Sequence, residues 1–238
     1  MTIKILYESD DMLVINKPAG LVVHADGKTE EDSVTDWLLE KYPDMKEVGE
    51  PTLLSSGKTI YRPGIVHRLD RETSGALLVA KNQKAFECLK DQFQNREIKK
   101  RYNAFVYGEM KEEDGTIDRD IARSKKDFRL FSAQRGGRGE ARPAITEYTV
   151  LHRSPEYTFI EARPLTGRTH QIRVHFKAIN HPVVCDRLYA PKQKPLLGFE
   201  RLALHARELT FTTLDREEVT VEAPYPTDFK QAMSHLPK

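Results

Sequence analysis

The sequence predicts an α+β fold in which a largely antiparallel mixed sheet carries flanking helices and loops. Many short segments rich in β-branched and aromatic residues follow one another, and turn-forming residues separate them. Helical patterns interrupt these strands only about three times, without the regular strand–helix alternation that a parallel sheet requires. The 238 residues contain no internal repeat, low-complexity tract or clear linker. We therefore expect a single domain over residues 1–238.

Turn and capping residues indicate where the first elements begin and end. Short strands are predicted at residues 3–7, 12–16 and 21–24. Ser33 is a suitable N-cap for a helix that contains Val34, Trp37 and Leu38 and stops at Pro43. Residues 43–64 are rich in Gly, Pro, Ser and Lys and predict a long loop.

Further strands and two more helices are predicted in the rest of the chain. The strand-like stretches are residues 76–80, 101–107, 144–152, 158–163, 202–205, 208–212 and 219–223. One helix follows the cap Asn82 and has apolar residues at helical spacing, and another runs from about His170 to Ile179. Residues 111–142 are polar and basic with little periodicity, which predicts an irregular insert.

Composition limits the class of protein. Apolar residues make up 39% and charged residues 31% of the chain, as in a soluble globular protein. No apolar run approaches the roughly 20 residues of a membrane span, and the N-terminus lacks a secretory signal. Cys88 and Cys185 form neither a CxxC pair nor a disulfide framework. We expect a cytoplasmic protein.

Charge is distributed unevenly, although the net charge is only +2. Residues 81–101 hold seven bases and three acids, and residues 119–142 hold eight bases and three acids. Either segment alone is equally compatible with an ordinary solvated surface. Together, in a near-neutral chain, they can present a positive face to a polyanion, which is consistent with a nucleic-acid partner.

Two stretches concentrate charged residues beside apolar ones. The first is HRLDRETSG at residues 67–75, which lies between the apolar runs GIV and ALLVA. It is read either as a salt-bridged surface turn or as a catalytic loop on a rigid sheet. The second is LTGRTHQIRVHF at residues 165–176.

Helical phase in the second stretch places Arg173 toward the core. With Thr169 as N-cap, residues 169, 172, 173, 176 and 179 share one helix face, which is otherwise mainly apolar. A guanidinium on such a face keeps its proton and needs an anionic partner, for which Asp70 is the natural candidate. The alternative is that Arg173 reaches solvent along its own stem.

Several other chemistries lack support in the sequence. His170, His175 and His181 do not match the spacing of two metal ligands one helical turn apart. A Ser-His-Asp triad remains open, but no GxSxG turn is present to carry its nucleophile. Neither GxGxxG nor a P-loop occurs, so a nucleotide cofactor has no binding motif.

Ordered motifs resemble those of the RluA-type RNA pseudouridine synthases. The matching stretches are INKPAGLVVHA at residues 15–25, GIVHRLDRETSGALLVAK at 64–81, KKRYNAFVYG at 99–108, LTGRTHQIRVHF at 165–176, HPVVCDRLY at 181–189 and RLALHARELTF at 201–211. HRLD with TSG, followed by GRTHQIR, is a specific combination. The resemblance covers nearly the whole chain and implies the pseudouridine synthase catalytic fold.

The resemblance also implies roles for individual residues. Asp70 would be the nucleophile, Arg173 its partner, and Tyr102 an aromatic face that stacks on the target base. The implied RNA-binding residues are Arg68, Lys99, Lys100 and Arg168. No metal or organic cofactor is implied, and the substrate would be ribosomal or transfer RNA.

The resemblance bears on organisation as well. The small N-terminal RNA-binding module of several family members is not expected, because the catalytic motifs begin almost at once. Residues 111–142 would then be a basic segment that faces the RNA, and we expect a monomer. Two other classes stay open: a catalytically inactive RNA-binding or assembly protein of the same fold, and a glycosidase that uses Asp70 and Glu72.

Overall fold

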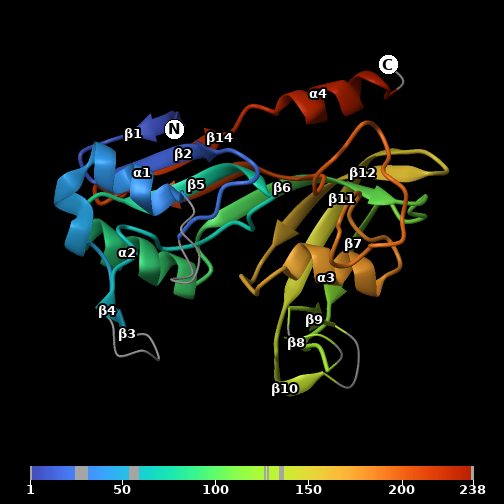
Figure 1. The fold of residues 1–238 in the computed structure, drawn as a ribbon, viewed down its shortest axis with the longest axis horizontal. Helices are drawn as coiled ribbons and strands as arrows, with labels where there is room; N and C mark the ends of the chain where they lie inside the picture. The colour runs from blue at the N-terminus through green and yellow to red at the C-terminus, as the bar shows by residue number, and fades with distance from the viewer. Residues whose placement is uncertain are drawn as a thin grey trace. The chain divides into compact units, whose positions relative to one another are not determined.

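The computed structural model describes residues 2–24, 32–53, 59–125, 127, 129–133 and 137–236. The chain divides into two compact units (Figure 1). The first unit contains residues 1–99 and 206–224, and the second contains residues 100–205 and 225–238. The expectation of a single domain stays a prediction. Parts of the first matching motif and of the basic insert lie outside the described residues.

The first unit is built on antiparallel strands. They are β1 (Lys4–Glu8), β2 (Met12–Lys17), β5 (Ser74–Ala80), most of β13 (Leu204–Thr212) and β14 (Glu218–Glu222). Their order is β1-β2-β5-β13, and β14 pairs with β13. All seven residues of β5 are buried, as the apolar ALLVA run predicts. This fully buried strand follows the charged loop directly and holds its end in place.

Two α-helices, one 3₁₀ helix and two short strands complete the described part of this unit. They are α1 (Val34–Lys41), the 3₁₀ helix η1 (Pro43–Glu47), the strands β3 (Thr52–Leu53) and β4 (Thr59–Ile60), and α2 (Gln83–Gln94). Ser33 caps α1 through a capping box with Asp36, and Asn82 caps α2, so both predicted caps are confirmed. The prediction of a long loop over residues 43–64 is wrong in part, since η1, β3 and β4 lie within it.

The predicted strand at residues 21–24 is also wrong. Val22 forms only an isolated bridge with Ser33. The backbone N–H groups of Val34 and Thr35 donate to the carbonyls of Val22 and Val23. These carbonyls therefore satisfy the first N–H groups of α1 and do not extend a sheet.

Gly75 tests how tightly β5 packs on its neighbour. Its φ is +114°, and an added Cβ would lie 2.1 Å from the carbonyl oxygen of Ala206. We expect Gly75→Ala to lower the free energy of unfolding by about 2–4 kcal/mol, because strain and a backbone clash add. Gly20→Ala is the control, since Gly20 has φ +86° with no atom of a described residue within 4 Å. If denaturant unfolding shows the same loss of unfolding free energy for Gly75→Ala and Gly20→Ala, the proposed backbone clash at Gly75 is wrong.

The second unit has its own antiparallel strands. They are β6 (Lys99–Tyr107), whose first residue belongs to the first unit, β7 (Asp114–Asp118), β11 (Ile145–Arg153) and β12 (Tyr157–Pro164), in the order β6-β12-β11-β7. Phe105 is fully buried and stacks on Phe159 at a ring-centroid distance of 4.6 Å. It also contacts Phe199 and Phe229, so aromatic side chains form the centre of this core.

The expectation of an irregular insert at residues 111–142 is wrong for the described residues. β7 pairs with β11 over five residues. The strands β8 (Ile121–Arg123), β9 (Phe131–Ser132) and β10 (Arg138–Arg142) form a separate small sheet in the order β10-β8-β9. Strands this short, with β10 exposed along its whole length, leave no clear apolar periodicity in the sequence.

Two helices lie in the described part of the second unit, α3 (Gln171–Ala178) and α4 (Thr227–Ser234). The predicted N-cap Thr169 is wrong: the cap is His170, in the left-handed region at φ +56°, without a side-chain cap bond. The N–H of Gln171 donates to the carbonyl of Arg168, and this turn starts the helix one residue later. α4 was not predicted, because only Phe229 and Ala232 are buried in it.

Elsewhere the strand predictions agree with the structure, except that the two predicted strands at residues 202–205 and 208–212 are one strand, β13. The pairs β1–β2, β2–β5, β13–β14, β6–β12, β12–β11 and β11–β7 are antiparallel, so the α+β class with a largely antiparallel sheet is confirmed. No helix among the described residues is long and apolar enough to cross a membrane.

Candidate active site

Asp70 lies on a loop that is fixed at both ends. Asp70 is half-buried, while Leu69 beside it is only 4% exposed. The Nε2 atom of His67 accepts a hydrogen bond from the N–H of Leu78 in β5 at 2.9 Å, and its ring stacks on Phe93. The carbonyl of Asp70 accepts from the N–H of Thr73 at 3.1 Å, which closes a turn. The loop therefore has the rigid support that a catalytic loop requires.

A buried lysine ties this loop to the segment after β2. Lys17 is fully buried, and its ammonium donates to the carbonyls of Pro18, Leu21 and Arg71 at 2.7–2.9 Å. The N–H of Gly20 donates to the same Arg71 carbonyl. Three acceptors match the three donors of an ammonium group, which makes its burial tolerable. The KPAG motif therefore has a structural purpose here: it holds the turn of Asp70.

Arg173 is buried as predicted, and it has a buried anionic partner. Its side chain is 8% exposed, and its Nε and Nη2 atoms bind Asp186 at 2.7 and 2.8 Å. The Asp186 side chain is fully buried. The need for a carboxylate is confirmed, but the carboxylate seen in this unit is Asp186, which sequence reasoning did not select. A pairing of Arg173 with Asp70 joins residues of different units and stays a prediction.

Asp186 is itself held in place. Its Oδ1 atom accepts hydrogen bonds from the backbone N–H groups of Leu188 and Tyr189, both at 3.0 Å. The Arg173 guanidinium lies over the ring of Tyr189, 5.0 Å from its centroid, and the Tyr189 hydroxyl contacts Nδ1 of His170. We call Asp186 and Tyr189 the arginine clamp. The signal that could have found it is an acid directly after the apolar residues of HPVVCDRLY.

Tyr102 and Lys100 share one face of β6, because side chains two apart in a strand point the same way. Tyr102 is half-buried and packs on the core of the second unit. Burial lowers the pKa of Lys100 to about 8, and its ammonium donates to the carbonyl of Thr166 at 3.3 Å. The Thr166 hydroxyl donates to Gln171, the first residue of α3. Tyr102 thus lies on a strand that is linked to the start of the helix of Arg173.

The other predicted RNA contacts differ in exposure. Arg68 is exposed, two residues before Asp70. Lys99 is exposed and pairs with Glu218 at 3.1 Å, and Arg168 is half-buried with its Nε donating to the carbonyl of Pro143. The strand β10 exposes Arg138 and Arg142. The structure keeps Arg68 with Asp70 in the first unit, and Lys100, Tyr102, Arg168 and Arg173 in the second.

The histidines considered as metal ligands bond to protein groups instead. His175 is fully buried between the Thr146 hydroxyl and the carbonyl of Arg119, and burial lowers its pKa. The Nδ1 atom of His181 contacts the carbonyl of Tyr107 at 2.9 Å. Over the described ranges, no group of three or more His, Cys, Asp or Glu could hold a metal ion.

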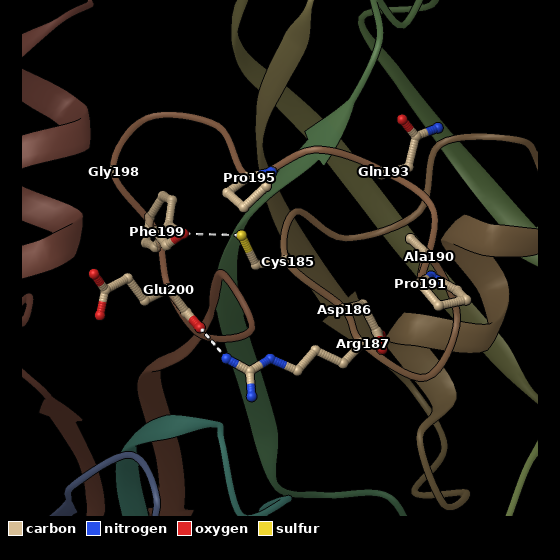
Figure 2. Close-up of a pocket in the computed structure, with 10 residues that line it drawn as sticks. All are labelled: Cys185, Asp186, Arg187, Ala190, Pro191, Gln193, Pro195, Gly198, Phe199 and Glu200. Carbon is tan, nitrogen blue, oxygen red and sulfur yellow. Dashed lines mark hydrogen bonds between the residues drawn. The ribbon is translucent and has the colours of Figure 1, made fainter.

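A pocket of about 720 Å³ lies in the loop that follows α3 (Figure 2). Its lining residues are Cys185, Asp186, Arg187, Ala190, Pro191, Gln193, Pro195, Gly198, Phe199 and Glu200. The Arg187 guanidinium reaches the carbonyl of Glu200 at 3.1 Å, and the Cys185 thiol donates to the carbonyl of Phe199 at 3.0 Å. Since these two polar groups are bonded to the loop itself, they hold the loop that carries Asp186 in shape.

Comparison with known proteins gives consistent matches over almost the whole chain. The family model described as RNA pseudouridylate synthase matches residues 11–178. An uncharacterized RNA pseudouridine synthase, YlyB of Bacillus subtilis (strain 168), is 39% identical over 239 residues, which cover all of this chain and 74% of the relative. A ribosomal large subunit pseudouridine synthase D of Neisseria meningitidis serogroup B is 38% identical, with 99% of this chain and 62% of the relative covered.

Two solved structures share the fold. Human RNA pseudouridylate synthase domain containing 1 is 30% identical with a TM-score of 0.72, covering 94% of this chain and 84% of that chain. Human RNA pseudouridylate synthase domain containing 4 is 25% identical with a TM-score of 0.74, covering 98% of this chain and 94% of that chain. The resemblance seen in the motifs therefore extends to the backbone.

Proposed function

This chain belongs to the RNA pseudouridylate synthase family, and we propose that it isomerises particular uridines of ribosomal or transfer RNA with Asp70 as the nucleophile. The family makes it an isomerase that acts on RNA. The observation that supports the role of Asp70 is its position. It is a half-buried carboxylate on a loop held by Lys17, His67 and β5.

The reaction exchanges one glycosidic bond for another. The bond between C1′ of ribose and N1 of uracil breaks, the base rotates, and C1′ bonds to C5. C5 loses its proton, and N1, which carries no proton in uridine, gains one, so the product is an isomer. A carboxylate can act as a nucleophile and form a covalent bond to the base or the sugar only while it is ionised. Asp70 would attack either the sugar or the base.

The second unit would supply the groups that surround the base. Arg173 would keep Asp70 ionised, since an adjacent guanidinium favours the charged carboxylate. Asp186 binds Arg173 through Nε and Nη2, which fixes the plane of the guanidinium group. Tyr102 would stack on the flipped uracil, because an aromatic ring offers a face to any base taken out of its helix.

RNA binding would rest on basic residues around these groups. Arg68, two residues before Asp70, would contact the displaced nucleotide, and Lys99 and Arg168 would meet phosphates. Lys100 stays mostly protonated at pH 7 with its pKa of about 8, and would act at closer range because its ammonium is largely buried. The exposed strand β10 would extend this basic surface. We propose a monomer that works in the cytoplasm without a cofactor.

Pseudouridine mapping tests the proposed function. Total RNA from cells without the gene is expected to lack pseudouridine at one or a few uridines, and purified protein is expected to restore it. RNA labelled with tritium at C5 of uridine is expected to release the label, because the reaction removes that hydrogen. If no position is lost on deletion and none is gained with purified protein, the proposed function is wrong.

The tritium-release assay also distinguishes the proposed enzyme from a catalytically inactive RNA-binding protein of the same fold. A binding or assembly protein of this fold would retain RNA in a filter assay without releasing tritium. Release that depends on intact RNA, and that does not produce free uracil, distinguishes isomerisation from cleavage of the glycosidic bond.

A further inference from the structure

We propose that His24, Arg62 and Arg68 form a binding site for one phosphate group, and that the phosphate is a phosphodiester of the substrate RNA beside the Asp70 loop. The phosphate site stands on the described residues alone, and its assignment to RNA rests on the proposed function. Nothing in the motif comparison assigned a role to His24 or Arg62.

The fold brings these three residues to the Asp70 loop from two segments. His24 follows the turn that Lys17 ties to the carbonyl of Arg71. Arg62 begins a turn in which its carbonyl accepts from the N–H of Ile65, and Ile65 forms a bridge with Val79 of β5. Arg68 follows on the same stretch of chain. Both segments are therefore anchored to the structure that holds Asp70.

The side chains lie within electrostatic reach of one another and have unused bonding capacity. Arg62 and Arg68 have no carboxylate within ion-pair distance among the described residues. The Nε atom of Arg62 and the Nδ1 atom of His24 are buried, without a hydrogen-bond partner in the same part of the chain. Folded proteins rarely leave buried polar atoms without a partner in this way unless a water, an ion or a ligand completes them.

The electrostatics favour an anion at this point. Burial, and then the charge of Arg68, lowers the pKa of Arg62. Burial, followed by the charges of Arg62 and Arg68, lowers the pKa of His24 to about 4, so this ring is neutral at pH 7. Two adjacent guanidinium groups repel each other, and an anion between them removes that repulsion.

The donor set fits a phosphate. Guanidinium groups bind phosphate oxygens through two parallel N–H bonds, and the neutral His24 ring can donate one more. Phosphate contacts fix the position of a nucleic acid strand and carry no sequence information. A phosphate held two residues from Asp70 along the chain, through Arg68, would set the register of the target nucleotide against the nucleophile.

The Arg62→Gln variant tests this site, with Lys84→Gln as control. Both remove one positive charge from the first unit, but Lys84 is exposed on α2 and is not one of the proposed phosphate ligands. We expect Arg62→Gln to weaken RNA binding about tenfold and to reduce the slope of log Kd against log salt by about one, whereas Lys84→Gln changes neither. Without RNA, the melting temperature of Arg62→Gln should match or exceed that of the wild type, since a repelling charge is gone.

A second arm uses inorganic phosphate and needs no RNA. Phosphate is expected to raise the melting temperature of the wild type and of Lys84→Gln, but not that of Arg62→Gln. If Arg62→Gln weakens RNA binding but leaves the effect of inorganic phosphate on the melting temperature unchanged, the site takes a phosphodiester and the proposal holds. If only the phosphate arm responds, the assignment to RNA is overturned, and if neither responds, the site is overturned. Wild-type protein that forms no pseudouridine would refute the proposed function, and the phosphate arm would still report on the site.

Discussion

Asp70→Asn is expected to reduce pseudouridine formation by about 10⁴-fold or more, while the protein still folds and binds RNA. Asparagine has nearly the shape of aspartate but carries no charge and is not a nucleophile. The loop should keep its conformation, because Leu69, His67 and the Lys17 contact to Arg71 hold it independently of the Asp70 carboxylate. Single-turnover tritium release and thermal unfolding measure the two effects.

Glu72→Gln is the matched control for Asp70→Asn. It removes a carboxylate from the same loop and leaves the proposed nucleophile in place. We expect tritium release within a few-fold of the wild type, since Glu72 has no role in the proposed reaction. A glycosidase that used both carboxylates would lose activity in either variant. Residual activity of Asp70→Asn near the wild-type level would contradict the nucleophile assignment.

The sequence was informative where local rules decide the structure. Side-chain caps such as Ser33 and Asn82 bond to backbone groups within three residues, and the buried run of β5 follows from its apolar residues alone. The core-facing position of Arg173 followed from helical periodicity, which is also local. These features were predicted correctly because nothing distant competes with them.

The errors arose where distant segments decide the structure. Residues 21–24 have the composition of a strand, but their carbonyls accept from the N-terminus of α1. β7 has a single buried residue, Ile117, and forms because β11 supplies a ladder about thirty residues away. No local pattern specifies such a partner.

The candidate site shows the same division. Residue type and helical phase were enough to require an anion for Arg173, but they could not choose between carboxylates. Asp186 lies 13 residues further along the chain and becomes the partner because the loop folds back on α3. The buried atoms of His24 and Arg62 likewise become visible only when the segments are brought together.

Asp186→Asn, which removes the charge of the arginine clamp, is expected to lower both the stability and the activity of the protein. Arg173 cannot lose its proton, and its side chain is 8% exposed, so removal of the charge of Asp186 leaves a buried cation incompletely compensated. Breaking a buried pair by removing one partner costs about 3–5 kcal/mol. We expect a loss of this size in denaturant unfolding, and on the order of a 100-fold fall in the rate of tritium release at a temperature where the variant is folded.

The pair of Arg201 and Asp228 separates positioning from stability. It is also bidentate, at 2.7 and 3.1 Å, it also has its guanidinium near an aromatic ring, and it lies in the same unit. Its side chains are 14% and 26% exposed, so Asp228→Asn should lower the free energy of unfolding less than Asp186→Asn does.

If Asp186 positions Arg173, then Asp186→Asn lowers kcat with RNA affinity little changed, and Asp186→Glu restores part of kcat. Asp228→Asn should leave kcat near the wild-type value. Equal kcat losses in Asp186→Asn and Asp228→Asn would mean that the clamp acts only through stability, and that its contact with Arg173 does not orient the guanidinium for the reaction.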